Sequence, residues 1–302
     1  PGQFSEGSFP NPNGTKVQDK HWVVIDPITN FVYMTWTQFD AYNSANPKDS
    51  SIIVFSKSMD RGLSWTEPIR ISKFGGDCLD GVNTVEGAVP ALGPNGEIFV
   101  CWSGPRGIML QKSTDGGLTW YEEERKIADH FGGWDINIPG VYRANGLPFL
   151  MSDLSGGKNH GHLYLNWCDQ RNGTNNTDVW LLKSVDGGES WSEPIRVNQD
   201  HTQSHQFLSS MTIDPKNGDL HFVYYDRRRF NDNRTDVYWA HSSDGGVTIN
   251  DLLISKKPFV PNSKIFFGDY LGIAALDGRV RPIWPRMDNG KISLWVALID
   301  LY

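Results

Sequence analysis

Charged and aromatic side chains recur at two kinds of position in this chain: just before apolar, strand-like segments and just after others. Arginine binds a carboxylate through two parallel hydrogen bonds, while carboxylates, histidine and tyrosine can transfer protons or attack a substrate. Gathered in one place, such groups suit an anionic sugar. The candidate residues are Asp19, His21, Asp40, Glu86, Arg143, Asp169, Arg171, His205, Asp226, Arg227, Asp269, Tyr270 and Arg286, with Trp134 as the candidate for stacking on a sugar ring.

The composition excludes several classes of protein. The 302 residues are 38% hydrophobic and 21% charged, which is too apolar for a disordered chain. The net charge of −7 argues against nucleic acid as a partner. The longest apolar runs, such as 22–25 and 52–55, fall far short of the ~20 residues of a membrane helix. The 31 glycines, 17 prolines and 12% aromatic residues favour an all-β protein.

The cysteines and the first residue say little about the compartment. Cys78, Cys101 and Cys168 allow at most one intrachain disulfide, and their spacing fits no zinc motif. The chain begins with Pro1 and shows no signal peptide, which we interpret as a processed or truncated N-terminus.

A short repeat organises the chain. The pattern Ser-x-Asp-x-Gly-x-x-Trp occurs at 58–65, 113–120 and 184–191, and a copy at 242–249 ends in Ile249 instead of tryptophan. Aspartate can bond to its own backbone two residues on, and glycine supplies a positive φ, so each copy predicts a tight hairpin turn. The turn would consume the aspartate carboxylate, which we therefore exclude from catalysis.

Strand-like segments frame every copy of the repeat. With no helical period, units of about 40–60 residues carrying four strands each predict propeller blades. The expected strands are 21–26, 31–36, 51–58 and 64–72; 88–94, 97–102, 107–113 and 119–127; 148–155, 162–167, 178–184 and 190–197; and 207–215, 220–225, 236–242 and 247–255. A fifth unit has only 271–276, 279–284 and 291–300, and residues 3–9 are the candidate for its missing edge strand.

These repeats are Asp-boxes, and the chain resembles the sialidase-like, BNR-repeat β-propellers over nearly its whole length. The segments 19–22, 86–90, 143–146 and 268–270 add to the resemblance to secreted bacterial proteins of the exo-sialidase-like kind. The resemblance implies a single all-β propeller domain over 1–302, with five visible four-stranded blades, or six if an upstream blade is missing or hidden. It also implies secretion to an extracellular or periplasmic location and an anionic carbohydrate ligand. Together with the net charge and the short apolar runs, this leads us to expect a monomer with no nucleic-acid partner, no membrane span and no cofactor, with Ca²⁺ open as a structural ion.

The resemblance also assigns roles. In a four-stranded blade the Asp-box turns lie on one face, so the candidate residues belong to the other. There the sialidase pattern implies Tyr270 as nucleophile, Glu86 as its base, Asp19 or Asp40 as acid/base, and a clamp for the substrate carboxylate. The clamp candidates are Arg171, Arg227 and Arg286.

Two other functions stay open. Asn137 stands before Ile138-Pro139, where the sialidase Arg-Ile-Pro motif has its arginine, and this favours a non-catalytic glycan-binding or scaffold propeller. A polysaccharide lyase, in which Tyr270 and a histidine would abstract a proton, is the third alternative.

Several candidates have a structural alternative. Asp169–Arg171 and Asp226–Arg228 could be ion pairs that pin their own loops. His21 and His205 could pack inside a channel rather than act on a substrate. The acidic loop with Asp77, Asp80 and Asn83 could hold Ca²⁺ or be solvated, and His160 and His162 have metal-like spacing without a carboxylate pair.

Overall fold

The computed structural model describes residues 6–11 and 13–301 and contains only β-strands, with no helix in these residues. Consequently no described helix is long and apolar enough to cross a membrane. The chain divides into two compact units, residues 1–128 and 129–302, each with its own sheets. The expectation of one domain over 1–302 stays a prediction.

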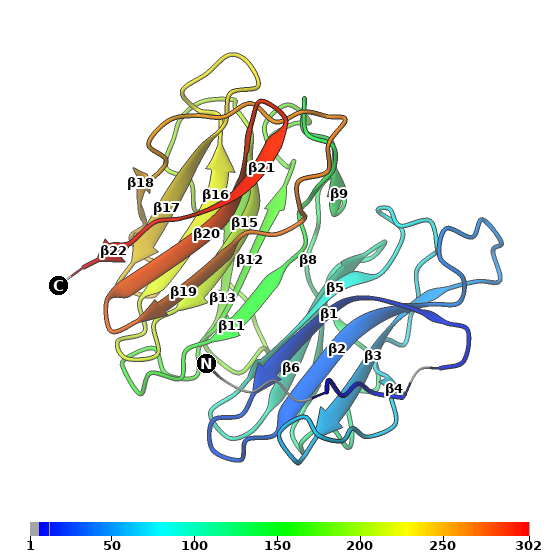
Figure 1. Ribbon diagram of the computed structural model, residues 1–302. Helices are drawn as coiled ribbons and strands as arrows, with labels where there is room; N and C mark the ends of the chain where they lie inside the picture. The colour runs from blue at the N-terminus through cyan, green and yellow to red at the C-terminus, as the bar shows by residue number, and fades with distance from the viewer. Residues whose placement is uncertain (1–5, 12, 302) are drawn as a thin grey trace. The chain divides into compact units, whose positions relative to one another are not determined.

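Unit 1 contains two four-stranded antiparallel sheets whose strands follow one another in chain order. The first sheet consists of β1 (Val17–Ile25), β2 (Val32–Phe39), β3 (Ser51–Ser58) and β4 (Ile69–Arg70). The second consists of β5 (Glu86–Leu92), β6 (Ile98–Gly104), β7 (Gly107–Ser113) and β8 (Arg125–Ala128) (Figure 1). Ile53, Ile98 and Trp102 are fully buried in the core of this unit.

Unit 2 contains three such sheets and one short pair. The sheets are β11 (Phe149–Ser152), β12 (Leu163–Asp169), β13 (Asp178–Ser184) and β14 (Ile195–Arg196); β15 (Gln206–Ile213), β16 (Leu220–Asp226), β17 (Asp236–Ser242) and β18 (Asn250–Leu253); and β19 (Gly272–Leu276), β20 (Arg279–Asp288), β21 (Lys291–Val296) and β22 (Ile299–Asp300). The pair, which the sequence did not predict, is β9 (Asp135–Ile136) with β10 (Ala144–Asn145). Phe207, Phe222 and Tyr225 are fully buried in the core of unit 2.

The strands before the Asp-boxes have the predicted bounds, since β3, β7, β13 and β17 match them at both ends. The outer strands are wrong in length: β4 covers only Ile69–Arg70 and β14 only Ile195–Arg196. Pro68 and Pro194 directly precede them, and proline has no N–H to donate to a neighbouring strand.

The last sheet corrects two expectations about the C-terminal strands. The predicted strand over 291–300 is interrupted at Ala297 and Leu298, and its halves β21 and β22 pair with the two ends of β20. Of the N-terminal segment 3–9, residues 3–5 lie outside the described residues, and residues 6–9 form no strand.

A bulge interrupts the first strand of three sheets. In β1, β5 and β15 two residues oppose a single residue of the neighbouring strand. The extra residues include Lys20, Gly87 and Leu208, with φ of 49°, 73° and 51°. Such bulges re-aim the side chains beside them. In β1 and β5 those side chains include Asp19, Lys20 and Glu86.

The Asp-box turns have the predicted internal chemistry. Asp115 accepts hydrogen bonds from Ser113 Oγ at 2.8 Å, from the Thr119 amide at 2.8 Å and from Thr119 Oγ1 at 2.5 Å. These bonds, led by the Thr119 hydroxyl, lower the pKa of Asp115 to about 2. Asp60 and Asp186 bind their own turns in the same way, so these carboxylates serve the backbone.

The three cysteines, Cys78, Cys101 and Cys168, are buried free thiols, so none forms a disulfide in this structure.

Gly117 in the second turn gives a test of this packing. Its φ is +88°, and a Cβ there would lie 2.6 Å from the Phe55 ring, which Trp120 contacts edge-on from another side. We expect Gly117→Ala to lower the free energy of unfolding by about 1–2 kcal/mol from backbone strain plus about 1–3 kcal/mol from the clash. Gly96→Ala is the matched control, because Gly96 has a φ of +83° and nothing within 4 Å of its Cβ position. Equal losses in urea unfolding for the two variants would contradict the packing argument.

Candidate functional site

A group of charged side chains surrounds the Lys20 ammonium in unit 1. Lys20 Nζ lies 2.8 Å from Glu86 Oε2, 3.4 Å from Asp19 Oδ2 and 3.8 Å from Asp80 Oδ1. The bulges in β1 and β5 bring these groups together, because Asp19 and Glu86 each stand at the start of one. We call Asp19, Lys20, Asp80 and Glu86 the Lys20 cluster.

Burial dominates the electrostatics of the Lys20 cluster. Glu86 is completely buried, and this burial raises its pKa to about 8 even though the Lys20 ammonium opposes the shift. Tyr42 donates a hydrogen bond of 2.5 Å to Asp80 Oδ2, and this bond raises the pKa of Tyr42 to about 12. The Asp19 side chain is 37% exposed, so it is the member of the cluster that solvent reaches most easily.

The carboxylates of the Lys20 cluster could in principle hold a cation, since oxygens of Asp19, Asp80 and Glu86 lie within 4.8 Å of one another. The Lys20 ammonium already supplies positive charge there. In the acidic loop with Asp77 and Asp80, Asp77 Oδ1 accepts hydrogen bonds from the Leu79 amide and the Thr84 hydroxyl, which tie it to its own turn. A structural Ca²⁺ therefore stays a prediction.

Asp40, the other acid/base candidate of unit 1, binds elsewhere. It forms an ion pair with Lys16 and accepts a hydrogen bond of 2.9 Å from the Ser50 amide. The Lys16 contact is the largest cause that lowers the pKa of Asp40. His21 is exposed.

In unit 2 the residue before Tyr270 is held by an arginine. Arg143 contacts both carboxylate oxygens of Asp269, with Nε donating to Oδ1 at 2.9 Å. Asn145 Nδ2 donates to the Asp269 carbonyl at 2.9 Å. These contacts fix the segment that leads to Tyr270 and into β19.

Two other arginines are each paired with the aspartate two residues before them, and one of them also binds an aspartate of β18. Arg171 donates from Nε to Asp169 Oδ1 at 3.0 Å and from NH2 to Oδ2 at 2.7 Å. Arg228 binds Asp226 at 2.8 Å and Asp251 at 2.6 Å. Burial raises the pKa of Asp226 to about 6. Both Asp-x-Arg pairs thus have the loop-pinning contact that was one of the two alternatives for them.

Arg227 differs from its neighbours because it forms no ion pair with a carboxylate among the described residues, although the charge of Asp232 acts on it. It is 3% exposed and donates to Thr235 Oγ1 at 3.1 Å, to the Pro139 carbonyl at 2.8 Å and to Asn233 Oδ1 at 3.3 Å. Its NH2 nitrogen has no hydrogen-bond partner among the described residues, and burial lowers the pKa of Arg227 to about 10.

A cleft of about 510 Å³ is lined by residues linked to Arg227, although Arg227 itself does not line it. Its partner Asn233 and the residue after its partner Pro139 both line that cleft. The lining residues from the other loops include Asn262, Ser263, Met287 and Asn289.

The remaining candidates of unit 2 are enclosed. Arg286 binds Asp288 at 2.6 Å and the carbonyls of Lys257 and Pro258 at 2.5 and 2.9 Å. His205 contacts Thr177 at 3.0 Å, and burial lowers its pKa to about 4. Trp134 is 2% exposed, so it could stack on a sugar only after its ring is uncovered.

Among the predicted site residues, the structure therefore places Asp19 near Glu86 and forms two ion pairs, Arg143 with Asp269 and Arg171 with Asp169. Glu86 belongs to unit 1 and Tyr270 to unit 2, so their pairing stays a prediction. The candidate set missed Lys20, although it stands in the quoted segment 19–22. It also missed Asp219, His221 and His241, which the cross-strand register of β16 and β17 brings together.

No family model and no curated protein matches the sequence. Solved structures do match. The NanB sialidase of Streptococcus pneumoniae aligns at 11% identity with a TM-score of 0.52, over 95% of this chain and 56% of its own. The alpha-L-arabinanase of Penicillium chrysogenum aligns at 16% identity with a TM-score of 0.59, over 99% of both chains. An alpha-L-arabinofuranosidase from Fusarium graminearum aligns at 13% identity with a TM-score of 0.57, over 99% and 98%.

These likenesses show the fold. The chain is an all-β protein of the β-propeller class, built from successive antiparallel sheets, as predicted. Its structural neighbours are glycoside hydrolases, and it spans about 56% of the length of the sialidase.

The buried carboxyl of Glu86 makes the stability of unit 1 depend on pH. Folded Glu86 keeps its proton up to about pH 8, whereas an unfolded glutamate loses it near pH 4.3. Between these values the folded state holds the extra proton, so this group lowers the free energy of unfolding as pH rises, by at most about 1.4 kcal/mol per unit. We expect the stability of Glu86→Gln, relative to the wild type, to increase between about pH 5 and 7.5 in urea unfolding.

Glu97→Gln is the control for this measurement. Although burial raises the pKa of Glu97, hydrogen bonds from Asn95 hold it below its usual value. Its stability difference from the wild type should therefore stay constant over the same interval, since its contribution is lost only at lower pH. A constant difference for Glu86→Gln as well would contradict the raised pKa.

Proposed function

We propose that the protein is a glycoside hydrolase of the propeller class that acts on acidic sugars. The observation that carries the hydrolase proposal is the Lys20 cluster, in which carboxyl groups with very different surroundings meet. Hydrolysis of a glycosidic bond needs a proton donor for the leaving oxygen, and two carboxyls in different environments can divide acid and base roles. The glycosidase neighbours are consistent with this activity but share only the fold.

In this proposal Asp19 is the catalytic acid/base, because it is the exposed carboxylate of the cluster. Lys20 is a positioning residue behind it. The ammonium lies between the two carboxyls, 3.4 Å from Asp19 and 2.8 Å from Glu86, and so holds the Asp19 side chain at the surface.

The preference for an acidic sugar rests on Arg227. A buried guanidinium with no ion pair to a described carboxylate leaves positive charge available to an anion, and its hydrogen-bond partner Asn233 lines the 510 Å³ cleft. The specific form of the proposal is an exo-sialidase, with Arg227 on the substrate carboxylate, Tyr270 as nucleophile and Glu86 as its base. The carbohydrate ligand and secretion belong to the same proposal.

A specific observation favours a second candidate, a non-catalytic glycan-binding propeller. Arg171 and Arg286, the other two members of the clamp, are bound by Asp169 and Asp288. A sialic acid carboxylate would have to compete with these partners. A protein that only binds glycans needs no such clamp.

Activity tests separate these candidates. We expect the wild type to release the fluorophore from a sialoside but not from an alpha-L-arabinofuranoside. Asp19→Asn should lower kcat by about 100-fold or more, because it removes the proton-transferring group. Asp26→Asn, directly after β1 and at the opposite end of that strand from Asp19, should leave kcat unchanged. Cleavage of the arabinofuranoside alone would refute the acidic substrate. Binding on a glycan array without cleavage of any substrate would refute the hydrolase.

The pH profile of the same assay defines the role of Glu86. If Glu86 is the base for Tyr270, activity rises toward pH 8 as its carboxyl ionises. A profile that falls as pH rises through this value would contradict the base role.

Anion recognition has its own prediction. Arg227→Lys keeps the charge but loses the planar fork, so we expect binding of free sialic acid, measured by calorimetry, to weaken by roughly 10–100-fold. Arg281→Lys is the control. Arg281 pairs with the exposed Asp300 and lies near the start of β20, whereas Met287, which lines the cleft, lies near the end of that strand. Equal affinity of the wild type for an uncharged monosaccharide would contradict recognition through the carboxylate.

A further inference from the structure

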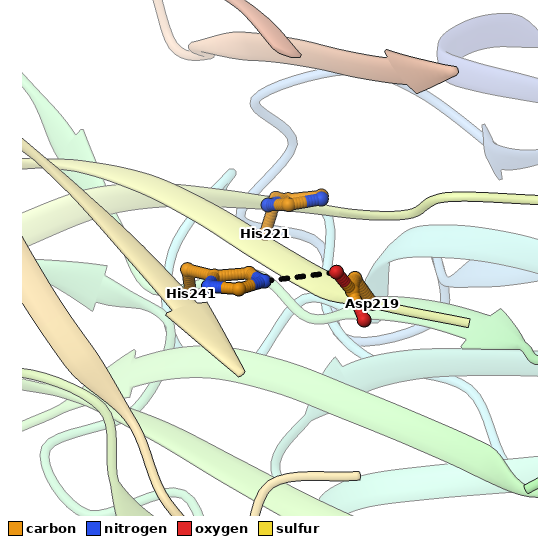
Figure 2. A group of neighbouring side chains, drawn as sticks. All are labelled: Asp219, His221 and His241. Carbon is orange, nitrogen blue, oxygen red and sulfur yellow. Dashed lines mark hydrogen bonds and ion pairs between the residues drawn. The ribbon is translucent and has the colours of Figure 1, made fainter. Parts of the chain in front are cut away.

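Three side chains in the sheet β15–β18 converge at the Asp-box end of two neighbouring strands. Asp219 directly precedes β16, His221 is its second residue, and His241 is the cross-strand partner of His221 in β17. One potential ligand atom from each lies within 4.8 Å of the other two. Figure 2 shows the two imidazole rings one above the other, with a nitrogen of each on the side of the Asp219 carboxylate.

His221 is the unusual member of this group. It is completely buried, and neither of its ring nitrogens has a hydrogen-bond partner among the described residues. A neutral imidazole always carries one N–H donor and one acceptor, and buried polar atoms are rarely left without a partner. An ion at this place would satisfy one of these nitrogens.

The rings are held in place by packing. The His221 and His241 rings stack at 4.9 Å with an angle of 12°, and Trp239 stacks on His241 at 5.6 Å and also at 12°. Three parallel rings on one face of the sheet restrict the side-chain rotations that would otherwise disperse the ligands. The pair of imidazoles is therefore preorganised before any ligand binds.

The spacing suits a small tetrahedral ion. Two ligands bound to zinc at about 2.0–2.1 Å and at tetrahedral angles lie about 3.3 Å apart. His241 Nε2 and Asp219 Oδ2 lie 3.1 Å apart, so an ion could replace the shared proton with little movement. His221 supplies the third ligand atom, which lies within 4.8 Å of the other two.

The geometry points to a zinc-binding site formed by Asp219, His221 and His241. Two imidazoles and one carboxylate suit Zn²⁺, whereas Ca²⁺ prefers oxygen ligands throughout. A water molecule would take the fourth position, on the side where His241 is 23% exposed. The site lies at the opposite end of β16 from Arg227 and is independent of the proposed activity.

The site has a structural role. It joins β16 and β17 to the turn 214–219, and Asp214 in that turn accepts a hydrogen bond of 2.8 Å from the Gly278 amide in the next sheet. An ion bound by the folded chain alone stabilises the fold. Zinc should therefore raise the unfolding temperature of unit 2.

The test uses the whole chain after treatment with a chelator and return to chelator-free buffer. Titration with ZnCl₂ in a calorimeter should give one ion per chain, and CoCl₂ should give the visible absorption bands of tetrahedral cobalt. CaCl₂ should give neither. His241→Gln and Asp219→Asn should weaken zinc binding by at least roughly 100-fold, more than the loss of an outer-shell partner costs, and should abolish the zinc-dependent rise in unfolding temperature.

His160→Gln is the matched control, because His160 belongs to the other closely spaced histidine pair and should not affect binding. His221→Gln is the most direct variant but removes a buried ring. His241→Gln, whose side chain is partly exposed, decides the matter if His221→Gln does not fold. Absence of stoichiometric zinc binding by the wild type, or equal binding by His241→Gln and Asp219→Asn, would overturn the site.

Discussion

The architecture depends on turns in which an aspartate side chain accepts hydrogen bonds from the backbone of its own loop. In each Asp-box turn a carboxylate binds the amides and the hydroxyl of its own loop, so the chain can reverse direction between the third and fourth strands without leaving donors unsatisfied. The low pKa values of Asp60, Asp115 and Asp186 follow from the same bonds. Because these acids serve the backbone, chemistry has to come from other carboxyls, such as those of Asp19 and Glu86.

The other ends of the sheets use a different device. In β1, β5 and β15 an extra residue bulges out and re-aims the side chains that precede and follow it. In unit 1 two such bulges bring Asp19, Lys20 and Glu86 together. Glycine provides the positive φ in β5, but Lys20 adopts it in β1 despite its Cβ. A non-glycine residue held in this conformation is a strained position, as is typical of functional sites.

Local features could be read from the sequence and non-local ones could not. The bounds of β3, β7, β13 and β17 were predicted because each strand ends at a turn with its own signal. The Asp169–Arg171 pair was among the alternatives because its members are two residues apart. The Lys20–Glu86 contact was not predicted, since it depends on two bulges in different strands. The proximity of His221 and His241 was not predicted, because only the register of β16 against β17 makes them neighbours.

The charged residues of this molecule differ in whether an oppositely charged side chain neutralises them. Arg171 and Arg228 are held by carboxylates at 2.7 Å or less, and such compensated pairs can pin loops without any ligand. Arg227 is buried and forms no ion pair with a described carboxylate, whereas Glu86 is buried with the Lys20 ammonium 2.8 Å away. In both residues burial is the largest cause of a pKa shift toward the uncharged form. Burying a charge without a full partner is unfavourable for folding. The Lys20 ion pair and the three hydrogen bonds of Arg227 offset part of this cost. In the proposed function, a ligand that carries charge or exchanges a proton would offset the remainder.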